Sequence, residues 1–398
     1  MKFQKKVLAN GLTVLFEKRD VDVTTVMIGV RYGSGYDCVE EKGMAHFIEH
    51  LCFKGTGKRS VREIAQEVEG LGGELNAFTH EEVTAYHVKL PSEHLDVAMD
   101  VIFDVFFNPS FPEDEIEREA GVICEEIKMY RDNPMRHTLE RIKSNLYDEP
   151  FGIFAAGRQD VVRGMTRRRL KERHDEVYIP ENSILCVVGN NEFKDIISFA
   201  KSLSPNSKIK SLKLKMPKIV LRNIRDDEKR EGLEQANVAL GFHFPKAGDR
   251  GNYAAEVFSA ILGQGMSSKL FSEVREKRGL VYGIKSDFDS GRDFGYMVIW
   301  AGTDFSKVEE VKKICLEEFA KMKNLTQKEL DEAKVQVVGN RKVDSEGSSE
   351  TAVNLVMSEV RGKVEEYYDY EKKINKVTLD DIRKLASKTE FASFSLSS

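Results

Sequence analysis

The sequence lacks any long, uninterrupted apolar segment, although hydrophobic residues make up 41% of its 398 residues. A helix needs about 20 apolar residues to cross a bilayer, and no run in the chain approaches that length, so no transmembrane helix is expected. The amino terminus also lacks an apolar core. MKFQKKVLANGLTVLFEK alternates like a β-strand, which predicts neither a signal peptide nor a transit peptide.

Paired cysteines and a strong charge of one sign are missing as well. The five cysteines are scattered and contain no C-x-x-C pair, which is typical of a reduced cytoplasmic protein rather than of a disulfide framework. The formal net charge is -5, and 32% of the residues are charged. This mixture of signs argues against the basic footprint of a nucleic-acid-binding protein and predicts an ordinary solvated surface.

What the sequence does contain is a repeated order of elements. Each half runs from a strand through a long apolar helix, a glycine-rich turn and further strands to long helices. GMAHFIEHLCFKGT (43–56) in the first half corresponds to NYAAEVFSAILGQG (252–265) in the second, which predicts an internal repeat. We therefore expect an α+β fold with two homologous halves, each a mainly antiparallel sheet packed by helices on one face.

A shift in composition sets the boundary between the halves. The stretch SPNSKIKSLKLKMPK is polar, basic and contains two prolines, which is typical of a linker. We predict a first half at 1–208, a linker at 209–232 and a second half at 233–398. The helices expected from periodicity and breakers lie at 92–107, 113–131, 305–322, 326–345 and 349–362.

Two of the eight histidines lie four residues apart in an otherwise apolar run. His46 and His50 occupy positions i and i+4 of a predicted helix, and Glu49 lies at i+3 from His46, so the three share a face. Two neighbouring neutral imidazoles suit zinc, which binds them at about 2.0–2.1 Å. Taken alone, the pair is also compatible with buried histidines that bind no metal. Catalytic zinc needs three protein ligands, so the third must come from another segment.

The helix expected at 113–131 offers that ligand. Glu119 and Glu126 are seven residues apart and share a face, and two carboxylates on one face of a half-apolar helix are costly unless a positive charge lies opposite. We assign Glu126 as the third ligand and Glu119 as a group that orients the site. Glu125 is the competing ligand, but it points about 100° away from Glu126. A solvated acidic helix face is the alternative interpretation.

The same residues suggest a reaction. Zinc held by three protein ligands keeps an open position for water and lowers the pKa of that water to about 7. Glu49 can take the proton of the attacking water and pass it to a leaving amine. These features predict amide hydrolysis with one Zn²⁺ per chain.

H-x-x-E-H is the inverzincin signature, and the wider pattern resembles the pitrilysin/insulinase family, particularly its mitochondrial-processing-peptidase-like branch. The resemblance covers nearly the whole chain. EREAGVICEEIKMYRDNP is similar to the family's second metal helix and LGGELNAFTHEEVTAYHVKLP to its substrate-edge hairpin. SSKLFSEVREKRGLVYGI is similar to the segment that carries a substrate-binding arginine and tyrosine. The resemblance implies the same zinc ligands and the same general base, Glu49.

The resemblance also implies substrate-binding residues. Asn76 and Ala77 would hold the backbone of an extended peptide on an exposed strand edge, and Arg275 and Tyr282 would stabilise the oxyanion formed on attack. From the residues alone, an asparagine such as Asn76 in a hairpin is more often a turn residue, and the other two are a surface arginine and a half-buried tyrosine. Family members enclose a chamber with two such pairs of halves, so this chain, which has one pair, is expected to form a homodimer.

The sequence thus predicts a cytoplasmic zinc-dependent endopeptidase that hydrolyses unfolded peptides or short protein segments inside a closed chamber, without nucleic-acid or membrane partners. The alternative is a non-catalytic scaffold or partner subunit of the same fold. Such subunits lose the ligands or the base, which this chain keeps. A metal-dependent hydrolase acting on non-peptides is a third and more remote hypothesis.

Overall fold

The computed structural model describes residues 2–206, 212, 214–362 and 364–398. The chain forms two compact units, each built on one β-sheet. The first unit contains Met1–Ile127, Ala155–Pro217 and Asp344–Tyr367, and the second contains Lys128–Phe154, Lys218–Val343 and Tyr368–Ser398. Part of the expected linker, 209–211 and 213, lies outside the described residues.

The sheet of the first unit has the strand order β1-β2-β6-β3-β5-β4. Neighbours β2 and β6 are parallel, and every other neighbouring pair is antiparallel. The strands are β1 (Lys2–Val7), β2 (Thr13–Lys18), β3 (Val23–Val30), β4 (Glu74–Thr79), β5 (Thr84–Pro91) and β6 (Ser183–Gly189). β4 and β1 are therefore the two edges of this sheet.

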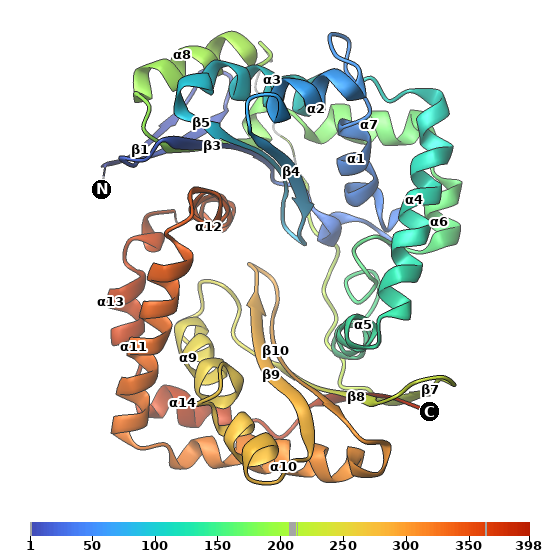
Figure 1. Cartoon of the computed structure of the whole chain (residues 1–398), viewed down its shortest axis with the longest axis vertical. Coiled ribbons are helices and arrows are strands. Elements are labelled where there is room, and N and C mark those ends of the chain that lie inside the picture. Colours follow the sequence, from blue (N-terminus) through green and yellow to red (C-terminus); the bar gives the residue numbers. More distant parts are fainter. Residues whose placement is uncertain (1, 207–211, 213, 363) are drawn as a thin grey trace. The chain divides into compact units, whose positions relative to one another are not determined.

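Helices cover both faces of the first sheet (Figure 1). Alternating side chains of β2 show the two faces: Phe16 stacks on Phe193 of one helix, whereas Leu15 joins an apolar cluster with Leu355 of another. The helices of this unit are α1 (Met44–Cys52), α2 (Val61–Glu69), α3 (Leu95–Phe107), α4 (Glu113–Asp132, which belongs to this unit up to Ile127), α6 (Gln159–Gly164), α7 (Arg167–Val177), α8 (Phe193–Leu203) and α12 (Ser348–Val360).

The second sheet has the order β7-β11-β8-β10-β9, with β7 and β11 parallel and the other pairs antiparallel. This repeats the directions of β2-β6-β3-β5-β4, as the predicted internal repeat requires. The strands are β7 (Arg225–Lys229), β8 (Ala236–His243), β9 (Val281–Ser290), β10 (Gly295–Thr303) and β11 (Ala392–Ser397).

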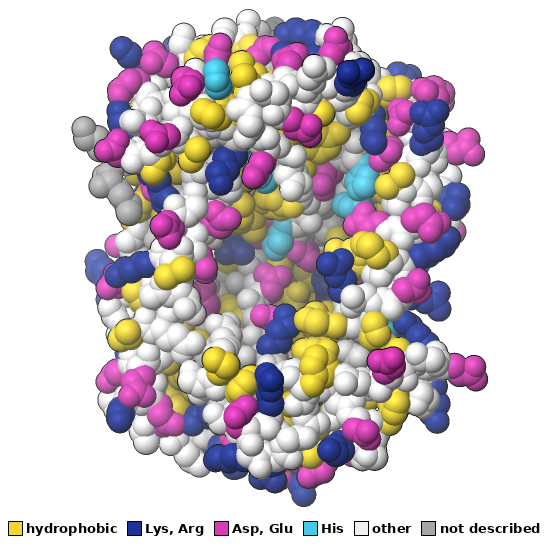
Figure 2. All heavy atoms as spheres, in the orientation of Figure 1, with side chains coloured by type: hydrophobic (Ala, Val, Ile, Leu, Met, Phe, Trp, Pro, Cys, Tyr) yellow, Lys and Arg dark blue, Asp and Glu magenta, His cyan; other side chains and the backbone are white. Residues whose placement is uncertain are grey.

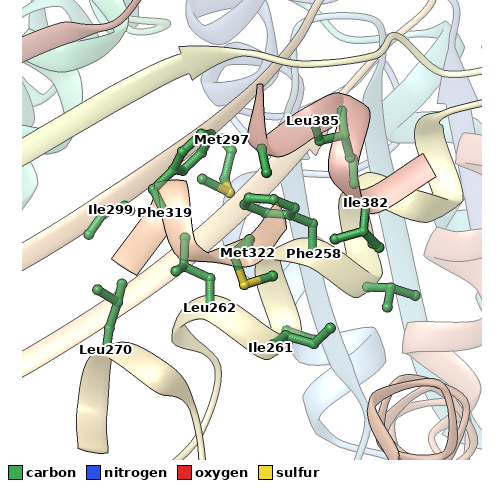
Figure 3. Packing of buried hydrophobic residues seen from close by; sticks show 14 of the residues in the cluster. Phe258, Ile261, Leu262, Leu270, Met297, Ile299, Phe319, Met322, Ile382 and Leu385 are labelled. Carbon is green, nitrogen blue, oxygen red and sulfur yellow. The ribbon is translucent and has the colours of Figure 1, made fainter. Parts of the chain in front are cut away.

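Helices also cover both faces of the second sheet. Phe242 of β8 stacks on Phe319 at a ring separation of 4.1 Å, whereas a side chain at the preceding Gly241 would meet Leu146 at 2.8 Å on the other face. Figure 3 shows Phe258 and Leu262 packed with Phe319 and Ile382 in the core. The helices are α5 (Pro134–Leu146), α9 (Asn252–Gly263), α10 (Val308–Lys321), α11 (Gln327–Asp344), α13 (Tyr370–Asn375) and α14 (Leu379–Ala386).

The mixed α+β class with two mainly antiparallel sheets is confirmed, and one feature goes beyond the expectation. Helix α5 comes from within 1–208 but packs on the second sheet, and α12 comes from within 233–398 but packs on the first. The repeat in the sequence therefore follows two continuous halves of the chain. Each compact unit, however, contains one helix from the other half. An amphipathic pattern shows that a helix face is covered, but not which sheet covers it.

The surface carries both signs of charge, as the composition indicates. On the face drawn in Figure 2, lysine and arginine side chains are interspersed with aspartate and glutamate. Among the described residues, no helix combines the length and the apolar character that a membrane span requires.

The exchanged helix gives a first prediction. Leu355 of α12 is fully buried in the cluster that covers the first sheet, so Leu355→Ala should lower the free energy of unfolding by about 2–5 kcal/mol. Val343, at the end of α11, is 71% exposed, and Val343→Ala should change that free energy by less than about 0.5 kcal/mol. Denaturant titration measures both values; equal values would show that α12 contributes little to the first unit.

Candidate metal centre

Helix α1 has one face in the core and one face that carries polar groups. Phe47 and Leu51 are fully buried, which fixes the rotation of the helix about its axis. His46, Glu49 and His50 therefore project from the opposite side. The helical spacing expected from the sequence is present, because α1 spans Met44–Cys52 without interruption.

A buried carboxylate holds the start of α1. Gly43 lies at the N-cap with φ +102°, a backbone conformation that favours glycine, and no side chain caps the helix from that position. Instead, Asp37 accepts hydrogen bonds from the N–H groups of Gly43 and Ala45 at 3.2 and 3.4 Å. Tyr32 donates to the other oxygen of Asp37 at 2.6 Å. The position of α1 is thus tied to the loop before it.

Helix α4 brings the third group to this face. Nε2 of His46 and Nε2 of His50 each lie 3.6 Å from Oε2 of Glu126. One ligating atom from each of the three residues lies within 4.8 Å of the other two. The adjacent Glu125 is exposed. The structure therefore brings together the three residues that the sequence analysis selected.

Glu119 sets the orientation of one imidazole. Its Oε2 lies 3.1 Å from Nδ1 of His50, and its Oε1 accepts a salt bridge of 2.7 Å from Lys54. A proton on Nδ1 of His50 leaves Nε2 as the free ligand atom facing Glu126. Nδ1 of His46, by contrast, is buried without a hydrogen-bond partner among the described residues.

The donor set fits a zinc ion. Tetrahedral zinc with bonds of about 2.0–2.1 Å separates its ligand atoms by roughly 3.4 Å, close to the 3.6 Å from each histidine nitrogen to Glu126. Two imidazoles and one carboxylate also form a common ligand set of catalytic zinc, which leaves a position for water. His46, His50 and Glu126 are thus the residues that could hold the metal.

The pKa values of His46 and His50 shift in opposite directions, because the two imidazoles have different charged neighbours. Burial and the neighbouring His50 lower the pKa of His46. Burial acts in the same direction on His50, but its hydrogen bond to Glu119 and the nearby carboxylate of Glu126 outweigh it and raise the pKa. The pKa of Glu119 shifts in the opposite direction: hydrogen bonds from His50 and Lys54 overcome the effect of burial and lower it.

Glu49 lies beside this cluster, and its carboxylate accepts one side-chain hydrogen bond among the described residues. The hydroxyl of Thr79, the last residue of β4, donates to Oε2 of Glu49 at 2.5 Å. Burial raises the pKa of Glu49, while this hydrogen bond works against the shift. A carboxylate with a raised pKa next to a metal site is suited to accept and return a proton.

The two residues expected to bind substrate backbone lie on the edge strand β4. The N–H of Ala77 donates to Oδ1 of Asn76 at 2.8 Å. Thr79 follows two residues later on the same strand, on the same side of the sheet as Ala77. One exposed strand therefore carries both the expected peptide-binding groups and the partner of Glu49.

Arg275 and Tyr282 belong to the second unit. Arg275 lies in a π-helical turn, Phe271–Glu276, with its guanidinium 4.7 Å from the centre of the Phe271 ring. Tyr282 is 60% exposed on the edge strand β9, edge-on to Trp300. Their expected action on substrate stays a prediction.

Three residues of the site were not found from the sequence. Lys54 lies at i+4 from His50, a spacing that could have revealed it. Thr79 follows Asn76 in the same hairpin, but the sequence does not show which face of the strand meets helix α1, so its contact with Glu49 could not be predicted. Asp37 lies in an irregular loop, where no periodicity predicts its partner.

Comparisons with known proteins find similar sequences over most of the chain. Residues 13–153 match the family model described as insulinase (peptidase family M16), and residues 164–337 match the model described as the peptidase M16 inactive domain. An uncharacterized zinc protease, YmxG, of Bacillus subtilis is 31% identical over 386 residues, which cover 95% of this chain and 93% of the relative. One from Rickettsia felis is 34% identical over 345 residues, covering 85% and 82%.

Solved structures show the same fold. A protease from Helicobacter pylori has a TM-score of 0.92 and 25% identity, covering 100% of this chain and 99% of that chain. A structure titled peptidase M16 inactive domain, from Pseudomonas fluorescens, has a TM-score of 0.88 and 22% identity, covering 100% and 98%.

The neighbouring carboxylates of α4 provide a matched pair for testing the metal site. Glu126→Gln should abolish tight zinc binding, because one of three ligands is lost, whereas Glu125→Gln should bind zinc like the wild type. Glu119→Gln should weaken zinc binding by about 10–100-fold, because it alters the hydrogen bond that orients His50. Competition with a chromophoric chelator measures all three. Loss of zinc from the Glu125 variant instead would reassign the ligand.

Proposed function

Because the chain belongs to the insulinase-type peptidases of family M16, we propose that it is a zinc-dependent endopeptidase that hydrolyses unfolded peptides or short protein segments. The observation that carries this proposal is the convergence of His46, His50 and Glu126, with Glu49 on the same helix face. Zinc protease is also the name given to relatives that span nearly the whole chain. We propose one zinc ion per chain.

In the proposed reaction, bound zinc would polarise the scissile carbonyl and acidify the attacking water. Glu49 removes a proton from that water and returns it to the nitrogen of the leaving amine. The carboxylate of Glu119 keeps the imidazole of His50 in one tautomer throughout. One glutamate thus serves first as base and then as acid, and so supplies both proton transfers of amide hydrolysis.

The edge strand β4 suits an extended substrate. A peptide that adds alongside an edge strand forms main-chain hydrogen bonds with little regard to side chains. The N–H of Ala77, which donates to Asn76 in the free protein, would donate to the substrate instead. This arrangement favours chains without their own structure and predicts loose sequence selection.

The alternative, a non-catalytic scaffold or partner subunit, lacks a supporting feature in this site. Such a subunit has no need of a base next to a complete ligand set. Here the ligand set, Glu49 and the group that orients His50 are all present. We therefore favour the enzyme.

Glu49 separates the two hypotheses. Glu49→Gln should reduce cleavage of an unstructured, internally quenched peptide by at least about 10²–10⁴-fold, because the amide side chain cannot accept the proton. Zinc content should stay the same, since Glu49 is not among the ligands. Glu125→Gln serves as the matched control and should cleave normally. Full cleavage by the Glu49 variant would contradict the proposed role, and mass spectrometry of the products would identify the bonds cut.

We further propose that the active form is a homodimer enclosing a chamber, in which Arg275 and Tyr282 of one subunit act at the zinc site of the other. Support comes from the family membership and from the single pair of units in this chain. A guanidinium and a phenol hydroxyl near the scissile carbonyl would stabilise the oxyanion formed on attack.

Mixing inactive subunits tests this arrangement. A Glu49→Gln subunit and an Arg275→Ala subunit should together regain activity, because the mixed dimer contains one site with an intact Glu49 and an intact Arg275 from the other chain. Glu49→Gln mixed with Glu126→Gln is the control and should stay inactive, since each defect lies in the zinc site of its own subunit and the mixed dimer therefore has no intact site. No recovery in dimers verified by native mass spectrometry, or an active monomer in light scattering, would exclude action between subunits.

A further inference from the structure

We infer that Thr79 is a positioning residue that holds the carboxylate of Glu49 in the orientation needed for proton transfer, an inference that rests on the proposed function. The hydroxyl of Thr79 donates to Oε2 of Glu49 at 2.5 Å. Across the described residues this is the one hydrogen bond that the protein makes to Glu49. Oε1 is thus left for a water molecule, while Oε2 is held.

The direction of the Thr79 hydroxyl is set by its neighbours. Thr79 pairs with Thr84 across the end of the β4–β5 hairpin, and their hydroxyl oxygens lie 3.4 Å apart. The hydroxyl of the fully buried Thr84 donates to the backbone oxygen of Tyr32 at 3.0 Å, which uses its single proton. Thr84 therefore cannot donate to Thr79. The proton of Thr79 goes to Glu49, the shorter contact and the stronger acceptor.

Glu49 needs such a partner because of its own flexibility. A glutamate side chain has three rotatable bonds, and its helix fixes none of them beyond χ1 preferences. Thr79, in contrast, is β-branched and sits in a strand, so its χ1 angle is restricted. One rigid hydroxyl therefore fixes the end of a flexible chain. A reacting group displaced by about 1 Å can lose about 10²-fold in rate.

The placement of Thr79 on an edge strand gives this contact a distinct kinetic signature. Its side chain points to Glu49, whereas the main-chain groups of β4 that do not pair with β5 point along the sheet toward an added peptide. Changing the side chain should therefore alter the chemical step and leave peptide binding intact. A change that merely loosened β4 would affect both.

Two substitutions of Thr79 provide the test. Thr79→Val keeps the shape but removes the hydroxyl, and it should lower kcat by about 10²-fold with KM and zinc content near wild type. Thr79→Ser keeps the hydroxyl and should retain most of kcat. Crystal structures of the metal-free variants add a readout independent of activity: Glu49 should keep its orientation in Thr79→Ser and lose it in Thr79→Val.

A matched control distinguishes positioning from stability. Thr24→Val makes the same replacement at a buried threonine of β3, whose hydroxyl bonds Ser92 and Asn191 at 2.8 and 2.6 Å. It should lower the melting temperature without changing kcat. Wild-type kcat in Thr79→Val, an equal loss in Thr79→Ser, or an equal loss in Thr24→Val would each overturn the inference. Retained cleavage by Glu49→Gln would instead overturn the proposed function itself.

Discussion

The candidate metal centre brings three carboxylates of like charge together in a half-buried site, and the rest of the first unit holds them there. Glu49, Glu119 and Glu126 converge with two imidazoles where water is partly excluded, and carboxylates left in such a position without positive partners are strongly disfavoured. Lys54 neutralises one of them. A divalent cation between His46, His50 and Glu126 would neutralise more, so the arrangement is consistent with a site built for a metal ion.

The rest of the first unit keeps two helices at the separation this site needs. Helix α1 is fixed by its buried apolar face and by the carboxylate of Asp37 at its start. Helix α4 presents Glu119 and Glu126 two turns apart, and the hydrogen bond that Glu119 accepts from His50 connects the helices directly. Strand β4 adds Thr79 from a third direction. Helix α1, helix α4 and strand β4 thus supply the groups of the site from three separate elements.

The shared helix faces of the site could be predicted from the sequence, because they follow from helical periodicity. The i and i+4 spacing of His46 and His50, and the i and i+7 spacing of Glu119 and Glu126, correctly predicted shared helix faces. Contacts between distant segments were less accessible: nothing in the spacing of Asp37 or Thr79 reveals a partner on another element. The exchange of α5 and α12 was missed for the same reason, since a helical pattern does not specify the surface it meets.

That exchange has a consequence for synthesis. Helix α12 covers the apolar cluster that includes Leu15, Met27 and Ile184, yet these strand residues leave the ribosome long before α12 does. At about 5–20 residues per second, the interval between β6 and α12 lasts roughly 10–30 s. During that time the nascent first unit displays an uncovered apolar face, which is the kind of surface that general chaperones bind. Truncation anywhere before α12 would make this exposure permanent, so premature termination should produce aggregation-prone fragments rather than a smaller working protein.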